Sequence, residues 1–217
     1  MKKRILSFVL AICLIIPCVA LLSACDNATY INVATMEELT AALTNDIEND
    51  VIVLDADLDL KEVNNNTALR IESGKHVLDL NGHTLMGVDN GNNSWHAIDL
   101  RGSETELTIK DSSTEQTGAI VGRCYGIQVS RGAKLTINSG NFVCTTNGTY
   151  NQSVVVYGGT LVVNGGSFTS KVGEVIYGSS YKWNDVEYNT NITINNGTFT
   201  CVATEASEDA LIRFEKH

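Results

Sequence analysis

Proline is almost absent from this sequence. Its 217 residues include one proline, Pro17, so the rest of the chain has no sequence for a proline-rich stalk or linker. Cations are also few, because 15 lysines and arginines stand against 25 aspartates and glutamates, a formal net charge of −10. This negative balance argues against nucleic acid as a partner.

The cysteines and histidines are too few and too widely spaced in the sequence to predict a disulfide framework or a metal site. Three of the six cysteines are in the first 25 residues, which leaves Cys124, Cys144 and Cys201. An odd number cannot form a closed disulfide framework. No Cys-x-x-Cys motif or close pair of histidines occurs. We therefore expect no metal site, and nothing in the sequence calls for a cofactor.

The first 24 residues have the pattern of an export signal. Three cations, Lys2, Lys3 and Arg4, precede an uncharged apolar run from Ile5 to Leu22. The alternative is an uncleaved membrane anchor, since the run is just long enough to span, but Pro17 interrupts it. We expect residues 1–24 to be a signal peptide, 25–30 a short tether and 31–217 the folded domain.

The four residues Leu22-Ser23-Ala24-Cys25 resemble the lipobox of bacterial lipoproteins. The resemblance implies that the sulfur of Cys25 carries a diacyl lipid, as palmitate labelling would detect, and that Cys25 becomes the new N-terminus. The expected location follows from it: exported, lipid-anchored to the cell membrane and facing outside the cytoplasm. The membrane, through the lipid on Cys25, is then the first expected partner.

A ten-residue phrase, Leu161 to Ser170 (LVVNGGSFTS), recurs along the chain. The leading residues of its copies are Leu78, Leu107, Leu135, Leu161 and Ile192, spaced 29, 28, 26 and 31 residues apart. A repeat of this length is typical of solenoids, propellers and arrays. Polar and apolar residues alternate within each copy, which predicts strands with one buried face.

Two columns of equivalent residues are expected to stack from repeat to repeat. The asparagines Asn81, Asn138, Asn164 and Asn195 follow the leading residues by three positions, and stacked amides can share hydrogen bonds along a ladder. The aromatic residues Phe142, Phe168 and Phe199 recur after the turn and are expected to stack inward.

A third strand precedes each leading residue. It aligns without gaps as 97–101, 126–130, 153–157 and 173–177, and three short strands per repeat predict a triangular prism of parallel sheets. Near the start, 30–33 is expected to be a strand. Thr35 and Glu38 fit a capping box, after which Leu39, Ala42 and Leu43 share one face of a helix that would cap the solenoid.

The phrase HVLDLNGHTL, followed by repeats that end in NGGSF or NNGTF, resembles the right-handed parallel β-helix of the pectin-lyase-like superfamily. The expected fold is all-β: a three-sheet solenoid of about five to six coils with a short N-terminal capping helix. Polysaccharide lyases, glycoside hydrolases, adhesins and surface proteins of no assigned activity share that fold, so it does not give the function.

The resemblance implies that a lyase would carry clustered outward acids for calcium and a nearby cationic base, and that a hydrolase would carry grouped aspartates. The outward positions of the repeats here are mostly inert. The nearest charged constellation is Asp99 with Arg101, which is more often a solvated cross-strand pair. We expect no catalytic residues, and a lyase or hydrolase remains the alternative.

One repeat carries an insertion of about eleven residues, 179–189, and such insertions often form the binding face. It holds Tyr181, Trp183 and Tyr188 and follows Tyr177, which is expected to stack beside Tyr157 of the previous repeat. Flat aromatic rings suit the apolar faces of sugars, so these residues predict a binding or adhesion module for a glycan or surface protein. The competing interpretation is that Trp183 only covers the flank of the solenoid.

The last residues, Asp209 to Phe214, have the pattern of the opening strand of a further coil, with Ala210, Ile212 and Phe214 on one side. An uncapped coil exposes unpaired backbone groups and an apolar cross-section. Two explanations are open: the sequence is part of a longer chain, or the C-terminal coil self-associates. The second would make the protein a structural component that assembles end to end.

Overall fold

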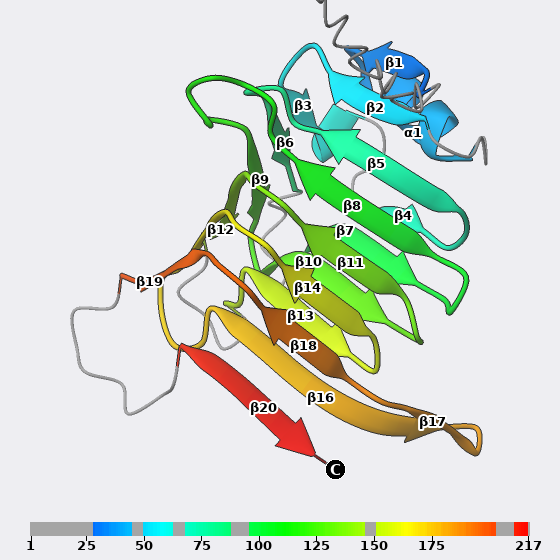
Figure 1. The fold of residues 1–217 in the computed structure, drawn as a ribbon, viewed down its shortest axis with the longest axis vertical. Coiled ribbons are helices and arrows are strands. Elements are labelled where there is room, and N and C mark those ends of the chain that lie inside the picture. Colours follow the sequence, from blue (N-terminus) through cyan, green and yellow to red (C-terminus); the bar gives the residue numbers. More distant parts are fainter. Residues whose placement is uncertain are drawn as a thin grey trace, which may run out of the picture.

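The computed structural model describes residues 28–44, 50–62, 68–87, 96–145, 151–202 and 211–216. This part of the chain is mostly strand, arranged in three sheets with one short α-helix (Figure 1). The predicted residue Cys25 and the signal peptide lie outside the described residues, as does Ala210.

Sheet A has seven strands that run parallel to one another. In spatial order they are β1 (Tyr30–Val33), β2 (Val51–Leu54), β5 (Lys75–Asp79), β8 (Glu106–Lys110), β11 (Lys134–Ile137), β14 (Thr160–Val163) and β18 (Asn191–Ile194).

Sheet B is also parallel and holds β3 (Leu58–Asp59), β6 (Thr84–Met86), β9 (Ala119–Gly122), β12 (Asn141–Cys144), β15 (Ser167–Ser170) and β19 (Thr198–Cys201). A short 3₁₀ helix, η1 (Leu60–Glu62), follows β3.

Sheet C contains the outer face that matters for the candidate site. Its strands are β4 (Leu69–Ile71), β7 (His96–Arg101), β10 (Tyr125–Ser130), β13 (Val154–Tyr157), β16 (Ile176–Trp183), β17 (Val186–Tyr188) and β20 (Ile212–Lys216). All pair in parallel except β17, which is antiparallel to β16.

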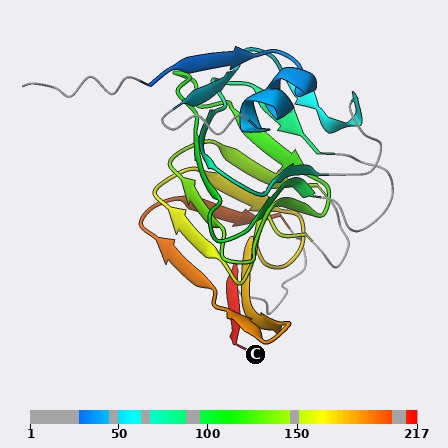
Figure 2. The same ribbon diagram turned by 90° about the vertical axis from the view of Figure 1, so that its right-hand side faces the viewer.

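The chain visits the sheets in the order C, A, B, as in β7, β8 and β9, and then returns to C with β10. We call three consecutive strands, one from each sheet, a layer. The layers stack along the long axis of the molecule (Figure 2). This topology is consistent with a parallel β-helix.

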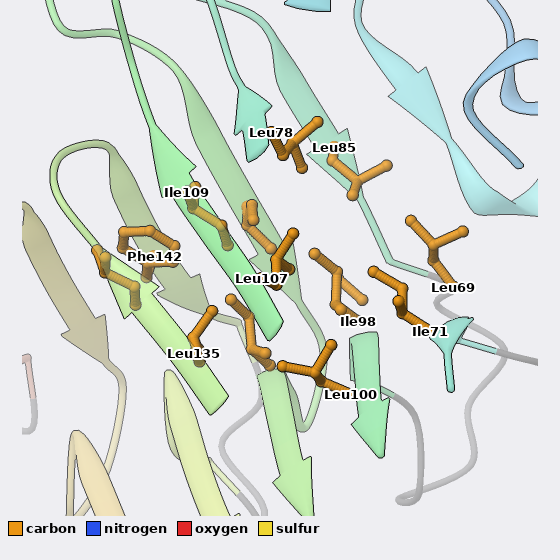
Figure 3. Close-up of a cluster of buried hydrophobic side chains, with 14 of the residues drawn as sticks. Leu69, Ile71, Leu78, Leu85, Ile98, Leu100, Leu107, Ile109, Leu135 and Phe142 are labelled. Atoms are coloured by element: carbon orange, nitrogen blue, oxygen red, sulfur yellow. The ribbon is translucent and has the colours of Figure 1, made fainter. Parts of the chain in front are cut away.

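The core lies between the sheets, because inward side chains alternate with outward ones on every strand. Leu78, Ile98, Leu107 and Leu135 are buried and point into a common interior (Figure 3). The predicted aromatic stack is confirmed: ring centroids are 4.9 Å apart between Phe142 and Phe168, and 5.0 Å apart between Phe168 and Phe199.

The N-terminal elements also agree with the sequence. The helix α1 (Met36–Thr44) buries Leu39, Ala42 and Leu43. The capping box is present, since the Glu38 amide donates to Thr35 Oγ1 at 3.2 Å and the Thr35 amide donates to Glu38 Oε2 at 3.1 Å. The asparagine ladder is confirmed for three members, with the amide of Asn195 donating to Asn164 and that of Asn164 to Asn138.

Two repeat alignments are wrong by two residues. His76 pairs with Leu107, so Leu78 pairs with Ile109 and Asn81 lies beyond the ladder, where its amide donates to the carbonyl of Leu54. A slip of two residues keeps every side chain on its own face. The alternation of apolar and polar residues therefore fits both registers equally well.

The second slip concerns the strand expected at 173–177. Tyr177 pairs with Val155, and it is Ser179 that pairs with Tyr157. The regular part of β16 therefore extends past the residue at which the insertion was expected to begin. The inserted residues form a β-hairpin, in which Tyr181 pairs with Tyr188 and Trp183 with Val186.

Candidate ligand-binding site

A hollow of about 300 Å³ opens on the outer face of sheet C, at the base of the β16–β17 hairpin. Three of its lining residues are aromatic and four are polar or charged: Tyr157, Tyr181, Trp183, Arg101, Gln128, Ser130 and Arg131. They come from β7, β10, the turn after β10, β13 and the hairpin. The structure thus unites Tyr157, Tyr181 and Trp183 of the predicted aromatic set with Arg101 of the charged pair.

The hairpin holds two of the rings on one side. Tyr181 and Trp183 are two positions apart on β16, so their side chains point to the same face. Asn184 and Asp185 have φ values of 47° and 63°, which is the backbone of a type I′ turn, the tight turn that suits a two-residue hairpin. Trp183 is 55% exposed, so it presents its ring to solvent at the hollow and is not packed away as a cover for the core.

Tyr188 lies beside Tyr181 on the same face of the hairpin, because the two residues are direct cross-strand partners. Its ring stacks on Tyr181 with a centroid distance of 5.2 Å and an interplanar angle of 21°. Gly158, with φ at +63°, lies beneath this pair, and a Cβ at that position would be 2.2 Å from the Cβ of Tyr188. Only glycine therefore allows the hairpin to approach β13 this closely.

Tyr177 is adjacent to the hollow but does not line it. Its ring meets Tyr157 edge to face, with centroids 5.9 Å apart and planes at 66°. Its hydroxyl donates to Glu215 Oε2 at 2.8 Å. Burial, together with this hydrogen bond, raises the pKa of Tyr177. Tyr177 therefore fixes the position of Tyr157, and its own hydroxyl is engaged by β20.

Asp99 is the buried acid beneath the hollow, which corrects the expectation of a solvated pair. It is 2% exposed because the side chains around it cover it. Arg101 contacts both carboxylate oxygens of Asp99: its Nε donates to Oδ1 at 2.8 Å, and its Nη2 lies 2.5 Å from Oδ2. Arg70 Nε lies 3.6 Å from Oδ2, and Gln128 Nε2 donates to Oδ1 at 3.2 Å.

This arrangement locks the guanidinium of Arg101 at the floor of the hollow. The hydrogen bond with Asp99 raises the pKa of Arg101, so it is cationic at every physiological pH. The contacts with Asp99 are made by Nε and Nη2 of Arg101. A planar, preorganised donor of this kind suits hydroxyl or acidic oxygens of a ligand.

Arg131 is the second cation of the hollow, and it does not stand out in the sequence pattern. It sits in the turn after β10 with φ at +55°, and its backbone amide donates to the carbonyl of Tyr157 at 3.3 Å. Among the described residues no carboxylate forms an ion pair with its exposed side chain. The register of the sheet could have indicated it, because Arg101, Ser130 and Tyr157 are aligned neighbours directly beside it.

Within the described ranges, no group of three His, Cys, Asp or Glu side chains is placed to hold a metal ion, and no disulfide joins any two of Cys124, Cys144 and Cys201. None of the described lining residues is an acid, and Asp99, which Arg101 and Gln128 contact, is engaged with Arg70, Arg101 and Gln128. What the hollow offers a ligand is therefore ring faces and hydrogen-bond donors.

Comparison of the chain with known protein families, with curated proteins and with solved structures finds no match. Among the residues that the structure describes, no helix has both the length and the apolar character needed to cross a membrane.

Proposed function

We propose that the chain is a surface-displayed, lipid-anchored right-handed parallel β-helix that binds carbohydrate without catalysing a reaction. The observation that carries the proposal is the hollow on sheet C, where Tyr157, Tyr181 and Trp183 stand over a floor of polar donors. Aromatic faces pack on the C–H faces of sugar rings, and fixed guanidinium and amide donors suit their hydroxyl oxygens. Concave sites with a few convergent polar groups are the usual form of small-molecule sites.

The β-helix supports this role by holding the site rigid. Arg101, Ser130 and Tyr157 follow one another across three hydrogen-bonded strands in perfect register. Neighbouring strands lie about 4.8 Å apart, which is close to the length of one sugar ring. A ladder of side chains with this spacing offers successive contacts to an extended oligosaccharide.

Anchoring is proposed from the sequence at Cys25. The first described strand, β1, begins at Tyr30 and lies at the end of the molecule opposite β20 (Figure 1). A lipid on Cys25 would therefore hold the protein by its N-terminal end. Cys25→Ala removes the only thiol of the lipobox, and radiolabelled palmitate that still enters this variant would end the lipoprotein proposal.

Catalysis is left out of the proposal because none of the described residues that line the hollow is an acid. A lyase or hydrolase needs carboxylates or bases free to meet the substrate. Asp99, the acid beneath the floor, is enclosed by Arg70, Arg101 and Gln128. A test for unsaturated products that absorb in the ultraviolet, or for new reducing ends, distinguishes the binding module from an enzyme.

The deciding experiment is a glycan array with the chain from residue 26 onward, followed by titration of the best ligand. Trp183→Ala should weaken binding about tenfold or more, equivalent to about 1.4 kcal/mol, and should leave the melting temperature nearly unchanged. Val186→Ala is the matched control, because Val186 is an exposed neighbour on the same hairpin that does not line the hollow. If Trp183→Ala binds as before, or if its only effect is early unfolding, the hollow is not the site.

A further inference from the structure

The two ends of the described structure differ in how far their apolar side chains are covered. At the N-terminal end, β1 extends sheet A and the helix α1 lays its apolar face over the core, burying Met36 and Leu39 (Figure 2). This is the capping that a stack of layers needs at its end. In the part of the chain that the structure describes, α1 therefore covers the apolar interior at the N-terminal end.

At the C-terminal end, apolar side chains of the last described strands are exposed. Ile194 is 37% exposed, although the aligned Val163 is fully buried. Ile212 is 37% and Phe214 52% exposed, although Ile176, which pairs with Ile212, is fully buried. We call Ile194, Ile212 and Phe214 the C-terminal apolar surface. Exposed apolar side chains next to a strand edge that has no described partner are a feature that proteins normally cover.

The strand β20 borders this surface, and one of its two edges has no partner among the described strands. It pairs with β16 on one side, and no described strand pairs with its other side. Phe214 sits over Gly178, where a Cβ would approach its ring to 3.3 Å. The absence of a side chain at Gly178 lets the ring lie on the core side of β20, next to the open edge.

We propose that the occupant of this end is a second copy of the chain, with β20 pairing antiparallel to β20 of the partner about a two-fold axis at Phe214. In an antiparallel pair centred on Phe214, each Arg213 lies opposite Glu215 of the partner subunit, and opposite charges in directly facing positions stabilise the pair. The sequence of β20 is therefore complementary to itself. The two Phe214 rings meet at the centre of the interface.

The charges around β20 favour this pairing. Within one chain, Arg213 is flanked by two carboxylates, Glu174 at 3.1 Å and Glu215. In the proposed pair, the partner's Arg213 places a second guanidinium opposite Glu215, and the first copy does the same for its partner. In a head-to-tail arrangement, β20 of one copy would meet the N-terminal end of the next copy. That end is covered by α1, and the two facing charge pairs would not form. The reciprocity of the facing charges favours a closed two-fold dimer over a head-to-tail arrangement.

Cross-linking of the full chain in detergent tests the axis directly. In a Cys201→Ser background, which removes the partly exposed native thiol near this end, Phe214→Cys should give a disulfide-linked dimer on mild oxidation. Facing Cβ atoms in an antiparallel pair are about 5 Å apart. Thr136→Cys, on the outer face of β11, is the control in the same background. Dimer no stronger than that in the control would overturn the proposal.

A charge swap tests the pairing by a second route. In a Glu174→Gln background, which removes the second carboxylate beside Arg213, either Arg213→Glu or Glu215→Arg alone should raise the dimer dissociation constant about tenfold, because two facing pairs become repulsive by symmetry. The double variant should restore it. Sedimentation provides the measurement and circular dichroism the check on folding. A parent chain that stays monomeric at tens of micromolar, or a double variant that remains as weak as the single ones, contradicts the proposal.

Discussion

Asp111 Oδ2 accepts a 2.7 Å hydrogen bond from the backbone amide of Gly118, seven residues further along the chain. The other oxygen, Oδ1, accepts from the amides of Gly82 at 2.9 Å and Ser113 at 3.1 Å. Burial opposes the ionised form of Asp111, but the hydrogen bonds from Ser113, Gly118 and Gly82 outweigh it and lower the pKa. One carboxylate thus joins two layers and closes the loop between β8 and β9.

The first prediction concerns this carboxylate. Asp111→Asn should lower the free energy of unfolding by about 2 kcal/mol, because an amide nitrogen then faces a backbone donor and the charge-assisted bonds are lost. Glu115→Gln, an exposed acid in the same loop, is the control and should change stability by less than about 0.5 kcal/mol. Equal stability of both variants in denaturant melts would mean that Asp111 does not hold the loop.

Gly118 gives a second, independent test of the same loop. A Cβ added to Gly118 would lie 2.6 Å from Leu80 Cβ and 2.7 Å from Asp111 Cγ, closer than real carbon atoms pack. Gly118→Ala should therefore cost about 2 to 3 kcal/mol. The exposed Thr114→Ala in the same loop should leave the melting temperature almost unchanged. A Gly118→Ala protein as stable as the parent would show that the loop shifts freely.

Much of the fold could be predicted from the sequence because its causes are local and periodic. Alternation of period two marks the strands, and the spacing of Phe142, Phe168 and Phe199 fixes the stack between layers. The registers of Leu78 and Tyr177 could not be fixed in this way, since a slip of two residues leaves every apolar side chain facing inward. Those registers depend on long-range contacts such as the hydrogen bond of Asn81 with Leu54.

The candidate site could be predicted only in part, because some of its residues are marked by local sequence and others only by their neighbours in the fold. Tyr181 and Trp183 stand out as rings in an insertion, whereas Arg131 is an ordinary exposed cation in sequence and gains meaning only beside Tyr157 and Arg101. The burial of Asp99 could not be read from its strand position either, because the cover comes from Arg70 and Gln128 on the two neighbouring strands.

A third prediction addresses the aromatic stack. Phe168 is fully buried between Phe142 and Phe199, so Phe168→Ala should cost about 3 to 5 kcal/mol through lost burial and the cavity that remains. Thr169→Ala, the next residue on β15 and on its outer side, is the control. A loss below about 1 kcal/mol in denaturant melts would contradict the inward stacking that the structure assigns to this column.

The last prediction concerns pH and His96. Burial lowers the pKa of His96 to about 4, with the charge of Asp99 opposing this and those of Arg101 and Arg70 adding to it. Its ring lies beside Tyr125, with centroids 5.1 Å apart. Unfolding returns the imidazole to water and to a pKa of about 6.5. The unfolded chain therefore takes up a proton at a pH where the folded chain does not.

The sign of the effect follows from this difference. The contribution of His96 to stability is fully present above about pH 6.5, declines as the pH falls and levels off below about pH 4, where both states bind the proton. The total change should be on the order of 3 kcal/mol. Free energies of unfolding at several pH values in this window give the slope for the parent and for His96→Phe, which keeps a ring beside Tyr125 but cannot titrate. His96→Gln separates titration from polarity, since it is polar and also cannot titrate. Both variants should have a flatter slope than the parent between pH 6.5 and 4; an unchanged slope in both would show that His96 does not carry the pH dependence.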